Sequence, residues 1–126
     1  MAEKIALKSL HLEYRLWIAE LNFDITLIRI LNDRLSEILA GGKDESKKEA
    51  GVFEKKFSVM RQSIDGLSHR MQIEKMNLAA DVRKNAAPDY QIIIPENHSG
   101  IRNDFFNFRV LFNELKSDFL HFEDKS

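Results

Sequence analysis

Two acidic residues stand in the sequence at positions where leucine would be expected, and they are the first candidates for chemistry. Asp24 and Glu74 each interrupt a series of apolar residues spaced three or four apart. A carboxylate buried in a helical core is costly unless a base or a metal ion neutralises it. The candidate metal or small-ligand set is Glu20, Asp24, Glu74 and His11, and two of these, His11 and Glu74, could also act as a general acid and base.

Both acids have a base opposite them if the chain folds as an antiparallel helical hairpin. With a turn near residues 42–43, facing residues have numbers that add to about 85. This register places Arg61 opposite Asp24 and His11 opposite Glu74. We interpret the pairs first as structural ion pairs that fix the register of the helices. Two other interpretations stay open: the acids lie exposed, or they form a functional site.

The sequence offers little further support for catalysis or metal binding. Carboxylate bundles that bind two irons repeat a Glu-x-x-His motif, whereas the nearest match here runs from Asp118 to His121, and His121 should point outward. The chain has no cysteine, phosphate-binding glycine loop, nucleophile elbow or His-Glu-x-x-His motif. His69 and His98 are expected to be exposed. We therefore predict a protein that is not an enzyme and has no cofactor, with metal or small-ligand binding as the alternative.

The overall composition is that of one globular domain. The chain has 126 residues, 44% of them hydrophobic and 31% charged, with a formal net charge of −1. This apolar fraction is too high for a disordered chain. No apolar run is long enough to span a membrane, and the balanced charge argues against nucleic-acid binding. We expect a single domain over residues 1–126 with a cytoplasmic location, which the absence of cysteine and of a signal peptide favours.

Glycines and prolines divide the chain into three long helical segments. The breaks fall at Gly41-Gly42 and in the stretch 86–100, which leaves helices over about 4–40, 46–85 and 100–123. Each helix carries an a/d seam, with apolar residues at alternating steps of three and four. The connector 88–95 holds three consecutive isoleucines, which predicts an extended crossover over the bundle end or, alternatively, a partner-binding edge. The predicted fold is all-α, an antiparallel long helical hairpin plus a shorter third helix in a coiled-coil-like three-helix bundle.

The third helix is predicted to leave the tip of the hairpin uncovered. It spans about 35 Å, against roughly 55–60 Å for the other two helices, and should end near residue 62 of the second. The first helix also has more apolar residues than one seam requires. An exposed apolar stripe of that size is typical of an interface. The residues predicted to form this interface are Ile28, Leu31, Leu35, Ile38, Phe53 and Phe57.

The segment 11–21 has the form H-x-E-x-x-x-W-x-x-E-L. It resembles the start of small bacterial helical proteins of uncharacterised function, which have a long first helix, a charged turn and a second long helix. The resemblance covers about the first 40 residues. It implies a cytoplasmic helical bundle, and it carries no functional residue over to this chain.

Surplus apolar surface without recognisable chemistry predicts a non-catalytic helical interaction or scaffold module. We expect it to self-associate as a homodimer, most simply a two-fold pair whose hairpin tips complete each other. An adaptor that binds a helix of another protein along the same stripe, and a monomer with a free tip, are the alternatives.

Overall fold

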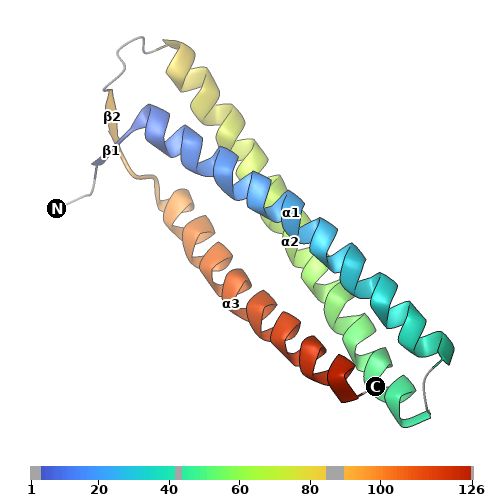
Figure 1. Ribbon diagram of the computed structural model, residues 1–126. Helices are drawn as coiled ribbons and strands as arrows, with labels where there is room; N and C mark the ends of the chain where they lie inside the picture. The colour runs from blue at the N-terminus through green and yellow to red at the C-terminus, as the bar shows by residue number, and fades with distance from the viewer. Residues whose placement is uncertain (1–3, 42–43, 85–89, 126) are drawn as a thin grey trace.

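The computed structural model confirms the all-α prediction and adds one small strand pair (Figure 1). It describes residues 4–41, 44–84 and 90–125. Strand β1 (Lys4–Ala6) leads directly into helix α1 (Leu7–Gly41), which is followed by α2 (Asp44–Lys84). Strand β2 (Gln91–Ile93) then precedes helix α3 (Glu96–Lys125). None of the helices in these ranges combines the length and apolar composition that a membrane span requires.

The a/d seams form the core, as predicted. On α1 the buried seam includes Leu10, Tyr14, Trp17 and Leu21. On α2 it runs from Phe53 through Ile64 to Leu78. The buried seam positions of α3 are Ile101, Phe105, Phe108, Phe112, Leu115, Phe119 and Phe122. The phenylalanine rings pack on one another and on α2, with the rings of Phe53 and Phe119 edge to face at 5.4 Å between centroids. They therefore fill the centre of the bundle.

The strand pair determines where α3 begins. β1 and β2 are antiparallel, with Lys4 opposite Ile93, and the N–H of Leu7 donates to the carbonyl of Tyr90 at 2.8 Å. The isoleucines of the connector favour this extended backbone because their side chains are β-branched. α1 consequently begins at Leu7 and not at residue 4. α3 begins at Glu96, a few residues earlier than predicted, after Pro95 accepts the first helical hydrogen bond from His98 at 3.0 Å.

α3 runs parallel to α1 and covers most of the hairpin (Figure 1). Three ion pairs between α1 and α3 each join residues 89 apart in the sequence: Glu13–Arg102, Glu20–Arg109 and Arg34–Glu123. The last of these lies close to the end of α3 at Lys125. The prediction that α3 covers only half of the hairpin is therefore wrong. The error arose because the prediction did not include β2. Its pairing with β1 places the start of α3 level with the start of α1, and α3 then extends to Lys125.

Candidate functional site

The residues predicted to form a dimer interface at the hairpin tip lie inside the bundle. The exposed fractions of Ile28, Leu35 and Phe57 are 3%, 2% and 0%. Ile38 and Phe53 are also buried, and Leu31 is half-buried against the same core. They are buried because α3 reaches this part of the hairpin. These side chains stabilise the monomer and are not available to a second copy.

Asp24 is buried as predicted, but its expected partner lies elsewhere. Arg61 donates to Asp65 of its own helix at 3.3 Å, and the described residues contain no ion pair between Asp24 and Arg61. Burial and the neighbouring Glu20 carboxylate raise the pKa of Asp24 to about 6, although Lys116 and Arg109 oppose this shift. The basic groups that act on Asp24 thus come from α3. The hairpin register alone could not reveal this.

The predicted pair of His11 and Glu74 is likewise not formed among the described residues. Both side chains are half-buried. Burial, Arg15 and Lys75 lower the pKa of His11, so its surroundings are basic. The charge of Glu74 instead helps to raise the pKa of Tyr14, which lies one turn further along α1. The register is correct to within about one helical turn, but the side chains do not meet.

The four candidate metal ligands fall into two separate places. Glu20 and Asp24 are one turn apart on α1, whereas His11 lies nine residues before Glu20, which is about 13 Å along the helix. Both Glu20 oxygens accept hydrogen bonds from Arg109, at 2.7 Å from Nε and 2.8 Å from Nη2. No group of three or more acidic, histidine or cysteine side chains with metal-binding geometry occurs within 4–41, 44–84 and 90–125. The geometry of these ranges therefore gives the metal alternative no support.

A buried polar cluster centred on His98 was missed by the sequence analysis. His98 is 1% exposed, so the prediction that it lies in solvent is wrong, whereas His69 and His121 are exposed as predicted. Its ring stacks on Trp17 at 5.2 Å, and Nδ1 lies 2.7 Å from the hydroxyl of Tyr14. His98 is buried because α3 begins at Glu96, which extends the seam of Ile101 back by one step of three.

The ring nitrogen Nε2 of His98 is buried without a hydrogen bond, 3.4 Å from the carboxylate of Glu13. Burial lowers the pKa of His98, and Glu13 partly opposes this effect. The same burial raises the pKa of Tyr14. The row Tyr14–His98–Glu13 has the residue types of a proton relay. Tyr14 and His98 are each 1% exposed, and the row reaches the surface at Glu13, whose side chain is 24% exposed. The cluster joins α3 to α1.

The outward side of α1 carries a second seam, which we call the outer stripe. Its residues are exposed, uncharged and spaced alternately three and four apart: Ser9, Leu12, Leu16, Ala19, Phe23, Thr26 and Ile30. The large members are substantially exposed, with Leu16 at 61%, Phe23 at 59% and Ile30 at 58%. Single exposed apolar residues need no explanation, but a regular uncharged series is the pattern of a helix that packs against another helix.

Charged side chains line both edges of the outer stripe. Glu13 and Glu20 lie along the edge nearest α3, where Arg102 and Arg109 hold them. Lys8 and Arg15 lie along the other edge and form no ion pair within the described residues. An uncharged seam between a basic and an acidic edge is found on helices that pair in coiled coils.

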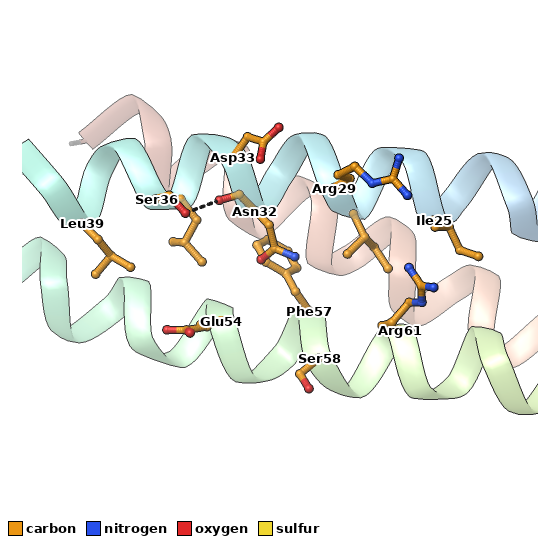
Figure 2. Close-up of a pocket in the computed structure, with 12 residues that line it drawn as sticks. Ile25, Arg29, Asn32, Asp33, Ser36, Leu39, Glu54, Phe57, Ser58 and Arg61 are labelled. Atoms are coloured by element: carbon orange, nitrogen blue, oxygen red, sulfur yellow. Dashed lines mark hydrogen bonds between the residues drawn. The ribbon is translucent and has the colours of Figure 1, made fainter.

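A groove between α1 and α2 opens on the side opposite α3 (Figure 2). It encloses about 510 Å³, and Ile28, Leu35 and Phe57 lie buried beneath it. Arg29 of α1 and Arg61 of α2 stand on its two walls near Ile25, as Figure 2 shows. The other lining residues are Asn32, Asp33, Ser36, Leu39, Glu54 and Ser58. The groove is wide because serine and asparagine stand along its rim where larger side chains would close it.

Comparison with known proteins finds no match for the chain among family profiles, curated proteins or solved structures. The fold and the surfaces described above therefore carry the functional argument.

Proposed function

We propose that the protein is a non-catalytic helical interaction module that self-associates through the outer stripe of α1. The observation that supports this most directly is the uncharged outer stripe itself. From Ser9 to Ile30 it extends for about 32 Å, or three heptads, which is long enough for a stable two-helix contact. The uncharged centre of such a contact, with an aromatic residue in it, has the composition of an interface core.

The occupant that fits the outer stripe is the same stripe of a second copy, arranged in parallel. In a parallel pair of helices, a residue on one edge of the seam faces the residue five positions later on the opposite edge of the partner. Lys8 would then face Glu13 of the second copy, and Arg15 would face Glu20. Each carboxylate can accept this additional cation, because its two oxygens offer about four acceptor sites. Near the end of the stripe Arg29 would face Arg34, whose charge Glu37 and Glu123 offset.

An antiparallel pair would lose this charge complementarity. Residues on the same edge face each other in that arrangement, so Arg15 would approach Arg29 of the second copy. α3 carries a competing exposed series with Phe106 and Val110, but asparagines at 103 and 113 interrupt it. The α1 stripe is therefore the more apolar of the two surfaces. The cytoplasmic location of the module stays a prediction from the sequence.

Native mass spectrometry of protein purified without chelators tests the proposal, because it reports copy number and bound metal together. We expect a dimer without metal. Phe23→Glu should convert it to a monomer, whereas Phe106→Glu on α3, at a phenylalanine of similar exposure (62% against 59%), should leave it dimeric. A wild type that is monomeric at all concentrations, or a dimer that only Phe106→Glu dissociates, would refute the assignment.

The orientation has its own test, since the natural chain contains no cysteine. In a parallel pair, Thr26 faces Thr26 of the second copy, close enough for a disulfide, whereas an antiparallel pair centred on the stripe holds the two copies of Thr26 far apart. Thr26→Cys should therefore oxidise to a covalent dimer, and Ser58→Cys, exposed on α2, should not. Equal cross-linking of both variants would contradict the parallel arrangement even if the protein is a dimer.

A further inference from the structure

We propose that a second groove, between α2 and α3, binds one amphipathic helix of a partner protein, whose apolar seam has an acidic edge and a basic edge. This groove consists of three adjoining hollows of about 330, 330 and 340 Å³. Lys56 and Asp118 line both the first and the middle hollow, and Met60 and Leu111 line both the middle and the third, so the three are continuous. No residue of the outer stripe lines them, so this inference does not depend on self-association.

Exposed apolar side chains give this groove a surface that a partner can contact. On the α2 wall, Val52 and Val59 are 52% and 55% exposed. On the α3 wall, Leu111 is 52% exposed, and Met60 lies half-buried between the walls. A helix laid along the groove would cover all four side chains. The burial of such apolar surface is the main driving force for association.

The α2 wall has the spacing and shape that a helical occupant requires. Val52, Val59 and Gly66 line it at intervals of seven residues, the repeat of a helix-packing seam. Gly66 has a negative φ, and a Cβ there would meet nothing within 4 Å among the residues that the structure describes. The fold therefore does not require this glycine, although only proline is less favourable inside a helix. A missing side chain in the wall allows the backbone of a second helix to approach closely.

The length of the groove determines the length of the occupant. From Val52 to Gly66 it extends for about 21 Å along α2, which is two heptads. Beyond Gly66, Arg70 of α2 donates to Asp104 of α3 at 2.7 Å, and this ion pair crosses the groove and ends it. The occupant is therefore a helix of about 14–18 residues.

The two walls carry opposite charges that are not paired across the groove. Lys55 and Lys56 of α2 and Glu114 and Asp118 of α3 all line the middle hollow. None of the four forms an ion pair within residues 4–41, 44–84 and 90–125. A helix with one acidic and one basic edge can pair with both walls at once, in the direction that matches them. A helix with two edges of the same sign meets a like charge on one wall.

Fluorescence anisotropy with a labelled synthetic peptide of about 18 residues tests the proposal on the full chain. The peptide repeats a heptad with leucine at a and d, glutamate at e and lysine at g, and it is kept at nanomolar concentration so that it does not pair with itself. Two comparison peptides carry lysine at both edges or glutamate at both edges. We expect saturable binding of one mixed-edge peptide per chain, at least about tenfold tighter than either comparison peptide.

Matched variants test whether the peptide binds in this groove. Leu111→Glu should weaken binding by about tenfold or more. Phe106→Glu, on the same helix at similar exposure (62% against 52%), and Phe23→Glu in the outer stripe should bind as the wild type does. Gly66→Trp should also weaken binding by about tenfold, because the ring fills the groove. Its urea-unfolding midpoint should not fall, because the new side chain enters open space and tryptophan is more favourable than glycine in a helix.

A reciprocal variant tests the charge pattern. Lys55→Glu combined with Lys56→Glu makes both walls acidic, so the peptide with lysine at both edges should become the tightest binder of the three. The proposal is overturned if no peptide binds, if the three bind the wild type equally, or if Phe23→Glu weakens binding and Leu111→Glu does not. If Leu111→Glu and not Phe23→Glu dissociates a dimer, the occupant is a second copy of this chain, which also overturns it.

Discussion

The buried carboxylate of Asp24 should reduce the stability of this protein at neutral pH. Asp24 is 7% exposed, and the bases near it, Lys116 and Arg109, do not offset the burial of its charge. Its pKa is raised from 3.8 to about 6. A raised pKa means that the folded state binds the proton more tightly than the unfolded state. The stabilisation by this proton is complete below about pH 4 and is lost as the pH rises through 6.

The magnitude follows from the size of this shift. A rise of roughly two pKa units corresponds to at most about 3 kcal/mol of unfolding free energy. Solvent at the edge of the site reduces this, so we expect about 1–3 kcal/mol. Asp24→Asn should therefore stabilise the fold more at pH 8 than at pH 4. The difference between its effects on the unfolding free energy at the two pH values should be about 1–3 kcal/mol. The difference between the two pH values isolates the ionisation, because changes in packing contribute equally at both.

Urea unfolding at fixed protein concentration, followed by circular dichroism at pH 4 and pH 8, measures the effect. Asp33→Asn is the control, because Asp33 is exposed on the same helix and its change should alter the unfolding free energy by less than about 0.5 kcal/mol. An Asp24→Asn effect that is the same at both pH values would refute the reasoning. It would mean that the Asp24 carboxylate is adequately solvated or paired in the folded protein.

Two further predictions concern the buried cluster and the core. The lowered pKa of His98 means that its contribution to stability is present above about pH 6.5 and is lost as the pH falls below it. His98→Phe should cost about 1–3 kcal/mol at pH 8, where it leaves the Tyr14 hydroxyl unpaired, and the difference in urea-unfolding free energy between wild type and variant should shrink between pH 6.5 and pH 5; a constant difference would contradict this. Phe57→Ala should lower the unfolding free energy by about 3–5 kcal/mol, whereas Phe23→Ala should weaken self-association with little effect on the monomer, and the reverse result in unfolding and sedimentation experiments would return the interface to the hairpin tip.

The core could be predicted from the sequence because it depends on a local period. Steps of three and four placed Phe53, Phe105 and Phe119 on inward faces, and this holds whichever helix covers them. The position of α3 along the axis of the bundle could not be predicted in the same way. It depends on the pairing of β1 with β2, a contact between residues almost ninety positions apart whose strands are only three residues long. Strands this short leave no alternation to recognise.

The candidate polar pairs were wrong for the same reason. A register deduced from two helices assigns Arg61 to Asp24, but the basic groups that act on Asp24, Arg109 and Lys116, come from the third. The three ion pairs with a constant separation of 89 residues show that α1 and α3 meet in a fixed parallel register. The ion pairs between α1 and α3 can thus be predicted from the sequence only once the first residue of α3 is known.

The surplus of apolar residues on α1 divides into two parts once the third helix is in place. Ile18 is buried, and Ile25 and Leu27 are partly buried against the core, so these residues belong to the bundle. Leu16 and Phe23 remain exposed, on the side of α1 that neither α2 nor α3 reaches. A helix that packs against two neighbours needs one broad apolar face, and a second uncharged seam on its opposite side contributes nothing to that packing. The surplus predicted from the sequence therefore remains on the outward side of α1, where we propose the interface, and not at the hairpin tip.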